Sequence, residues 1–350
     1  MVKRYYGGVI SATQAVANAS SATGFFNVTQ QMQAVQAGEW PLQPPPPQNT
    51  AAWFGGGYAL HPSGNYYWSI STVQRITFAT DTATASVRGP LSAGTTQLGA
   101  AGNTTDGWFG GGRRINVPSP TGSRSTVDRI TYATDTATAS VRGPLSSTRY
   151  NLAAAGNNTD AWFGGGESTS TVDRIAYATD TATASVRGPL SSARGKLGAA
   201  GNETDGWFGG GYVAYYNPSQ STVNRITYST DTATTSVRGT LSVSSYDIAA
   251  AGNSTDAWFA GGKNPGADPI STVSRITYAT DTATASVRGP LNATRYGLGA
   301  AGNTTNGWFG GGMNYSTVSR ITYATDTATT STRGPLSVQA VRLAAAGGIQ

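Results

Sequence analysis

A segment of about fifty residues occurs six times along this chain, and this repeat constrains the fold more than any other feature. Each copy contains the motif Trp-Phe-Gly-Gly-Gly, with alanine replacing the first glycine in one copy, and successive tryptophans are 45 to 55 residues apart. A unit of this size cannot bury a core alone, so the units must stack on one another. The six tryptophans are Trp53, Trp108, Trp162, Trp207, Trp258 and Trp308.

Three further motifs repeat with the same period: Ser-Thr-Val-x-Arg-Ile, Thr-Asp-Thr-Ala-Thr, and Arg-Gly followed by Pro-Leu or Thr-Leu. The arginines of the first of these are Arg75, Arg129, Arg174, Arg225, Arg275 and Arg320. The aspartates of the second are Asp81, Asp135, Asp180, Asp231, Asp281 and Asp326. The arginines of the third are Arg88, Arg142, Arg187, Arg238, Arg288 and Arg333.

Each repeat predicts four short strands, because Val, Ile, Tyr and Thr favour extended structure and Gly, Asn, Asp and Pro separate them. No segment of the repeat has the 3.6-residue apolar period of a helix. In the third repeat we expect strands a to d at Tyr150–Ala155, Ala161–Gly165, Thr171–Tyr177 and Thr183–Arg187.

The two ends of the repeat region complement one another. No strand a precedes the first Trp-Phe-Gly-Gly-Gly, whereas the last repeat is followed by an additional strand a at Val341–Gly347. We therefore expect this last strand to complete the blade that begins at Ala52, which closes the ring and removes open sheet edges. The sequence predicts an all-β fold, a closed six-bladed β-propeller of four-stranded blades over residues 51–350.

The repeat resembles the kelch motif, in which a Gly-Gly pair ends strand b, an aromatic residue lies on strand c, and Asp or Asn occupies the c–d turn. Gly165, Gly166, Tyr177 and Asp180 hold these places in the third repeat. The resemblance extends from residue 51 to the C-terminus. It departs from the kelch pattern because the tryptophan precedes the glycines in strand b and strand d has none.

The positions that are constant among the repeats are expected to be structural. Trp and Phe of strand b should pack between blades. Each aspartate should cap its own turn by accepting a hydrogen bond from the backbone N–H two residues on. The twelve arginines should bind loop carbonyls or the aspartate of a neighbouring unit. The alternative is a six-fold ring of arginines around an anion in the central channel.

The variable positions lie in two sets of loops that antiparallel strands place on one face. The b–c loops contain 13, 12, 3, 9, 8 and 3 residues between the last glycine and Ser-Thr-Val, and the d–a loops vary in sequence. Insertions of this kind often form a binding face. Tyr, Asn, Asp and Arg suit glycans and adaptable protein contacts. The candidate ligand-binding residues are Tyr58, His61, Tyr66, Tyr67, Trp68, Arg113, Arg114, Tyr150, Tyr212, Tyr215, Tyr216, Tyr246, Tyr296 and Tyr315.

The composition argues against several kinds of chemistry. The chain has one histidine, His61, and no cysteine, so we expect no catalytic triad, no metal site and no cofactor. Paired carboxylates for glycoside hydrolysis remain possible in principle, but the repeats contain only Glu167 and Glu203 as glutamates and most aspartates occupy constant turns, so we expect no enzyme. The formal charge of +6 is spread thinly, which disfavours nucleic acid and leaves an acidic polysaccharide or lipid head groups open as partners. No apolar stretch has the length of a membrane span, so we expect no membrane insertion.

Residues 1–40 belong to no repeat, and residues 41–50 form a proline-rich linker. We expect a short strand near Tyr5 and one helix over Thr29–Gly38. A segment this short cannot bury a core of its own, so it should dock onto another protein. The candidate attachment residues are Tyr5, Tyr6, Phe25, Phe26, Met32, Val35 and Trp40.

The arm resembles the N-terminal segment of structural proteins from tailed phages of marine bacteria, especially cyanophages. The resemblance rests on Tyr-Gly-Gly-Val-Ile-Ser from Tyr6, Ser-Ala-Thr-Gly-Phe-Phe-Asn-Val from Ser21, Gln-Gln-Met-Gln from Gln30, and Ala-Gly-Glu-Trp-Pro from Ala37. It implies a tail fibre or appendage on the virion surface, made in the host cytoplasm and present in several copies, whose arm binds other virion proteins. The loop face would bind a host-surface glycan or protein. The alternatives are a capsid decoration protein (head fibre) and an intracellular kelch scaffold.

Overall fold

The computed structural model describes residues 16–17, 22–23, 50–61, 64, 66–115, 121–213, 219–313 and 315–347. The chain divides into two units, Met1–Pro47 and Gln48–Gln350. In the first unit, β1 (Val16–Ala17) pairs antiparallel with β2 (Ala22–Thr23), a pair that the sequence did not predict. The predicted strand near Tyr5, the predicted helix and the candidate attachment residues lie outside the described residues.

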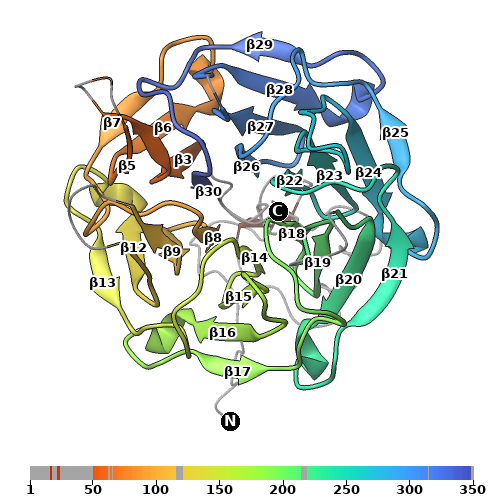
Figure 1. The fold of residues 1–350 in the computed structure, drawn as a ribbon, viewed down its shortest axis with the longest axis horizontal. Coiled ribbons are helices and arrows are strands. Elements are labelled where there is room, and N and C mark those ends of the chain that lie inside the picture. The colour runs from red at the N-terminus through yellow and green to blue at the C-terminus, as the bar shows by residue number, and fades with distance from the viewer. Residues whose placement is uncertain are drawn as a thin grey trace. The chain divides into compact units, whose positions relative to one another are not determined.

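The second unit is a six-bladed β-propeller, and each blade is a four-stranded antiparallel sheet whose strand a lies nearest the central axis (Figure 1). Strands a are β8 (Gly99–Gly102), β14 (Ala153–Gly156), β18 (Gly198–Gly201), β22 (Ala249–Gly252), β26 (Gly299–Gly302) and β30 (Ala344–Ala346). Strands b are β3 (Ala51–Gly55), β9 (Asp106–Gly110), β15 (Asp160–Gly164), β19 (Asp205–Gly209), β23 (Asp256–Ala260) and β27 (Asn306–Gly310).

The outer half of each blade carries the Val-x-Arg-Ile strand and a short edge strand. Strands c are β6 (Val73–Thr77), β12 (Val127–Thr131), β16 (Val172–Ala176), β20 (Thr222–Thr227), β24 (Val273–Thr277) and β28 (Val318–Thr322). Strands d are β7 (Ser86–Arg88), β13 (Ser140–Arg142), β17 (Ser185–Arg187), β21 (Ser236–Thr240), β25 (Ser286–Arg288) and β29 (Ser331–Arg333).

The ring is closed as the sequence predicts. The first blade has the order β30-β3-β6-β7, so its inner strand comes from the C-terminal end of the described chain. In this pairing Trp53 lies opposite Ala346 and Gly55 lies opposite Ala344. The last strand and the first strand b thereby share one sheet, and the edge of β3 is covered.

Strand b is buried on both faces, because each blade packs between two neighbours. Its tryptophan points to one neighbour and its phenylalanine to the other: Trp108 of the second blade shares an apolar cluster with Phe163 of the third. Both side chains are almost fully buried. The same combination recurs at the other interfaces between blades, which confirms that the repeated aromatic pairs form the core.

Strands c and d of the third blade are shorter than predicted. Strand c ends at Ala176, because the next three residues form a single 3-10 turn that moves the ring of Tyr177 onto Trp108 of the preceding blade, with ring centroids 3.7 Å apart. Strand d starts only at Ser185, because the amide of Ala184 donates to the carbonyl of Pro144 in the preceding blade. The 3-10 turns are η1 (Phe78–Thr80), η2 (Tyr132–Thr134), η3 (Tyr177–Thr179), η4 (Tyr228–Thr230), η5 (Tyr278–Thr280) and η6 (Tyr323–Thr325).

The sequence predicts that each turn aspartate binds a backbone N–H of its own turn, and this predicted partner is wrong. Each aspartate accepts a hydrogen bond from the indole N–H of the preceding blade, as in Trp108 Nε1 to Asp180 Oδ2 at 2.9 Å. The other five indole-to-carboxylate distances are all 2.8 Å. The carboxylate binds this buried donor because an indole N–H that is buried without an acceptor would destabilise the folded protein.

The same carboxylate also binds two arginines of the preceding blade. Asp180 Oδ2 lies 3.1 Å from Arg129 Nη1, on strand c, and 3.4 Å from Arg142 Nε, on strand d. All twelve repeated arginines are used in this way, which confirms the predicted pairing with a neighbouring aspartate. None of them lines the pockets of the central channel, so the proposed arginine ring around a channel anion is wrong. We call the Trp, the two Arg and the Asp of each interface the interblade latch.

We predict that Gly188→Ala destabilises the propeller by about 2–4 kcal/mol, because overpacking a closed interface is expensive. A Cβ at Gly188 would lie 1.7 Å from the carbonyl oxygen of Ala233 in the next blade, so the blades would have to separate. Gly122→Ala is the control, since a Cβ there meets nothing within 4 Å. Urea denaturation should show a large loss for the first variant only, and equal midpoints would contradict the prediction.

Candidate functional site

The b–c loops and the d–a loops meet on one face of the propeller, as the sequence predicts, and we call it the loop face. Isolated backbone bridges join a d–a loop to a b–c loop at four places: Thr96 with Arg113, Gly195 with Tyr212, Tyr246 with Lys263, and Val341 with Tyr58. Two b–c loops extend as small hairpins, β4 (Tyr58–Leu60) with β5 (Tyr67–Ser69), and β10 (Arg113–Arg114) with β11 (Gly122–Ser123).

The β4–β5 hairpin carries five candidate residues in two aromatic groups, which the strand register places on opposite faces of the hairpin. His61 stacks on Tyr66 with ring centroids 4.4 Å apart, and it meets Trp68 edge-on at 5.2 Å. Tyr58 and Tyr67 make a second edge contact at 5.7 Å. Tyr67 is 38% exposed. The hairpin therefore presents aromatic surface to solvent on a backbone-paired support.

Most of the remaining described candidates form cation–aromatic pairs between neighbouring loops. The guanidinium of Arg113 lies 5.3 Å from the ring centre of Tyr150, and the ammonium of Lys263 lies 4.1 Å from that of Tyr296. Such contacts hold a cation in place without neutralising it.

The candidates thus lie in several groups around the loop face rather than in one pocket. Arg114 pairs with Gly122 in the second hairpin. Tyr315 lies against the guanidinium of Arg295, 5.8 Å from its ring centre. Tyr215 and Tyr216 lie outside the described residues.

A ring of six residues at the channel mouth was missed by the sequence analysis. Each residue stands two positions before the first residue of a strand a and has a positive φ, between 55° and 69°. Each amide donates to the carbonyl of the ring residue before it, at 2.6 to 2.9 Å, and the six bonds close on themselves. We call this set the mouth ring: Gln97, Asn151, Lys196, Asp247, Gly297 and Arg342.

One glycine could have revealed this ring. The residues at this position are unlike one another, but the fifth d–a loop has Gly297 there, and glycine often marks a left-handed backbone. The other five residues adopt the same φ without that freedom, at a cost of about 1 kcal/mol or more each. Strain repeated at one ring of a fold is a sign of a constrained site.

Only cationic side chains of the mouth ring reach solvent. Lys196 and Arg342 are half-buried, whereas Gln97, Asn151 and Asp247 are buried. Asp247 holds Arg342 through two contacts, at 2.9 Å and 3.2 Å. Burial lowers the pKa of Arg342, but the adjacent carboxylate outweighs burial and raises the pKa overall, so the guanidinium stays charged.

Lys196 is placed differently. Its ammonium lies 4.7 Å from the ring centre of Tyr212 and 5.3 Å from that of Tyr246. No carboxylate among the described residues lies within ion-pair distance of it. Burial raises the pKa of Tyr246, which keeps this phenol neutral beside the ammonium.

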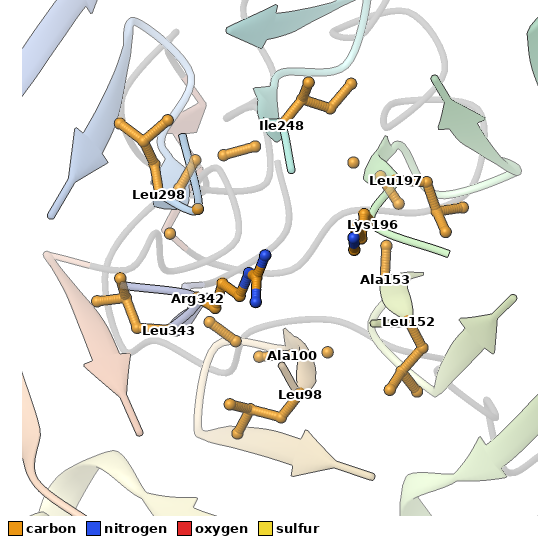
Figure 2. Close-up of a pocket in the computed structure, with 18 of the residues that line it drawn as sticks. Leu98, Ala100, Leu152, Ala153, Lys196, Leu197, Ile248, Leu298, Arg342 and Leu343 are labelled. Atoms are coloured by element: carbon orange, nitrogen blue, oxygen red, sulfur yellow. The ribbon is translucent and has the colours of Figure 1, made fainter. Parts of the chain in front are cut away.

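The mouth ring surrounds a pocket of about 100 Å³ at the loop-face end of the channel. In Figure 2 the aliphatic residues that follow the ring, such as Leu98, Leu152 and Ile248, stand around the pocket, and Lys196 and Arg342 lie nearer its middle. Below the mouth the channel wall is made of the alanines and glycines of strands a.

Three further arginines of the d–a loops are structural. Arg149 pairs with the buried Asp173 at 3.0 Å. Arg194 and Arg295 are buried and bind carbonyls, an amide and hydroxyl groups instead. Burial lowers the pKa of both to about 10, which still leaves them charged at neutral pH.

The described residues hold no group of three His, Cys, Asp or Glu side chains arranged for a metal ion. Within the same part of the chain, no helix is long and apolar enough to cross a membrane.

Fold and site define a closed β-propeller with one elaborated loop face. No protein-family model and no curated protein matches the sequence. Among solved structures the chain is similar to YjhT, with a TM-score of 0.60 and 10% identity, over 82% of this chain and 99% of that one. A likeness at this level of identity concerns the fold alone.

Proposed function

We propose that this protein is a structural protein of a phage virion, a tail fibre or appendage, whose loop face binds a host-surface glycan or protein without catalysis. The observation that supports ligand binding best is the pair of aromatic groups on the β4–β5 hairpin, in which Tyr67 is exposed and Tyr66 and Trp68 are half-buried. Partly exposed rings on a fixed support are what the apolar face of a sugar, or a flat protein surface, stacks against.

The arrangement of the propeller supports a binding role as well. The constant residues form the interblade latch, in which Trp and Arg of one blade bind Asp of the next. The variable residues are concentrated on the loop face, where they can change without disturbing the blades. This division is what a display domain requires.

Placement on a virion rests on the resemblance of the N-terminal arm to phage structural proteins. In this proposal, residues 1–40 attach the protein to the particle and the propeller faces outward. A deletion of Met1–Trp40 should then abolish incorporation into particles while the free propeller remains folded. Incorporation without the arm would refute this part of the proposal.

We predict that the full chain binds one or more host-surface glycans on an array, and that the triple variant Tyr66→Ala, Tyr67→Ala, Trp68→Ala loses at least about tenfold in affinity, since stacked aromatic residues often dominate such interfaces. Val186→Ala is the control, because Val186 is 59% exposed on the outer strand β17, away from the loops. Equal binding by the triple variant and the control would contradict the role of the hairpin.

The array experiment also separates the alternatives. A head-fibre decoration protein predicts no specific glycan and particles that infect normally without the protein. An intracellular kelch scaffold predicts a cytoplasmic protein partner captured by the same loop face.

A further inference from the structure

Two cations line the mouth of the central channel, and the one carboxylate in its lining is the buried Asp247. The exposed Glu167 lies outside this lining, where it accepts a hydrogen bond from Asn151 at 2.7 Å. Lys196 and Arg342 are the only ring side chains that reach solvent, and the one carboxylate of the ring, Asp247, is buried against Arg342. We propose that the channel mouth is a second binding site on the loop face, and that it takes a sugar residue bearing a carboxylate, with Lys196 binding the carboxylate. This inference rests on the proposed glycan-binding function and specifies the charge of the glycan.

The two cations have different tasks. Arg342 has its strongest acceptor already in place, because Asp247 binds it through both carboxylate oxygens. Lys196 contacts the faces of Tyr212 and Tyr246, which stabilise a positive charge but take up none of the three ammonium hydrogens as conventional hydrogen bonds. Its donors therefore remain available to an incoming anion.

The surroundings of the mouth also favour an anion. The accessible basic residues of the b–c and d–a loops outnumber the acidic ones, so the field of the loop face attracts negative charge. The basic residues are Arg113, Arg114, Arg124, Lys196, Lys263 and Arg342. The accessible acidic residues are Glu167 and Asp268, since Asp247 is buried.

A sugar acid fits the mouth better than a bare anion does. The half-buried ring of Tyr212 stands beside the ammonium and offers apolar surface to the C–H face of a pyranose. The ring of Tyr246, which is buried, lies 5.3 Å from that of Tyr212 and supports it. The pocket of about 100 Å³ is open toward the loops, so the charged group can enter while the rest of a polymer stays outside.

The backbone of Lys196 supports a role beyond packing. With φ at 59°, lysine occupies a conformation in which Gly297 serves the equivalent blade. A glycine would complete the same hydrogen-bonded ring with less strain, since only the backbone takes part in those bonds. Lysine at this place therefore costs the backbone more than glycine would, and its ammonium is what the side chain adds to the mouth.

The experiment uses the full chain, with D-glucuronate, D-glucose and acetate as probes followed by ligand-observed NMR. We expect glucuronate to bind with a Kd on the order of 1 mM, and glucose and acetate to bind at least about tenfold more weakly. Lys196→Gln and Lys196→Gly should weaken glucuronate binding at least about tenfold, because a hydrogen bond to a charged group is lost. Lys196→Gly should not lower the melting temperature by more than about 3 °C.

Lys263→Gln is the matched control, because it removes the same charge from the same face but Lys263 does not line the pocket. It should leave glucuronate binding within about twofold of wild type. Binding unaffected by Lys196→Gly, or equal for glucose, would overturn the anion site, and equal binding of acetate would overturn its sugar specificity. Array binding that depends on the hairpin but not on Lys196 would refute the mouth site alone, whereas the absence of any glycan binding by the unchanged chain would refute glycan binding by the loop face as a whole.

Discussion

A chain that ends at Ala340 is expected to lose the closed ring and to aggregate. The deletion removes β30, whose residues pair with β3 opposite Trp53 and Phe54. The unpaired edge of β3 is then free to pair with another molecule. It also breaks the mouth ring, because Arg342 both donates to Gly297 and accepts from Gln97.

The size of the effect follows from burial. Val341 and Leu343 are 3% and 4% exposed, and burying two such side chains contributes about 3–6 kcal/mol. Ala344 and Ala346 belong to the cluster around Trp53 and add to this loss. The total stability of a domain is only about 5–15 kcal/mol, so the deletion removes a large share of it.

A chain ending at Gly347 is the control, because it loses only residues 348–350 and keeps the whole of β30. Size-exclusion chromatography and thermal melting should show a monomer-like, cooperative protein for this chain and aggregation for the shorter one. A shorter chain that stays dispersed and melts in one sharp transition would show that the closing strand is not needed.

The fold could be predicted from the sequence because the pattern of each strand recurs six times. An irregular sequence gives one chance to recognise a strand, whereas here Val, Ile and the glycines recur at the same distances from the tryptophan. Closure was predictable for the same reason, since one repeat lacked a strand a and the strand at Val341–Gly347 had no blade of its own. Strand ends were less predictable, because contacts with the neighbouring blade determine them, as at Tyr177 and Ala184.

The site was only half predictable. The sequence places Tyr67 and Trp68 on the loop face, but their grouping depends on the hairpin that β4 and β5 form. The mouth ring escaped because it is defined by backbone conformation and not by residue type, so Lys196 and Arg342 looked like unrelated loop residues. The turn aspartates were assigned to their own turns because local partners are visible in a sequence, whereas the tryptophan that Asp180 binds is 72 residues away.

Replacing Asp180 with alanine is expected to destabilise the propeller by about 2–4 kcal/mol, since the change leaves a buried donor and two arginines without their acceptor. The indole of Trp108 is 1% exposed, so its N–H is left in a buried environment when the carboxylate is removed. Arg129 and Arg142 are 26% and 20% exposed, so solvent offsets part of their loss, and the indole accounts for much of the effect.

A double-mutant cycle tests this division. Trp108→Phe keeps a ring to stack on Tyr177 but removes the N–H donor, so the loss from Asp180→Ala should be smaller by about 1 kcal/mol or more in that background. Asp160→Asn is the matched control. Asp160 is the first residue of strand b in the same blade, and the sixth repeat has Asn306 at the equivalent place. It should change stability by less than about 0.5 kcal/mol.

The latch at the junction of the last and first blades extends the test to the ring as a whole. Asp81 accepts from Trp308 at 2.8 Å and from Arg320 at 3.0 Å, contacts that match those of Asp180 although they join opposite ends of the repeat region. In a closed ring this interface is equivalent to the other five, so Asp81→Ala should cost as much as Asp180→Ala in chemical denaturation. A much smaller loss for Asp81→Ala would mean that this junction opens in solution, and the six interfaces would then no longer be equivalent.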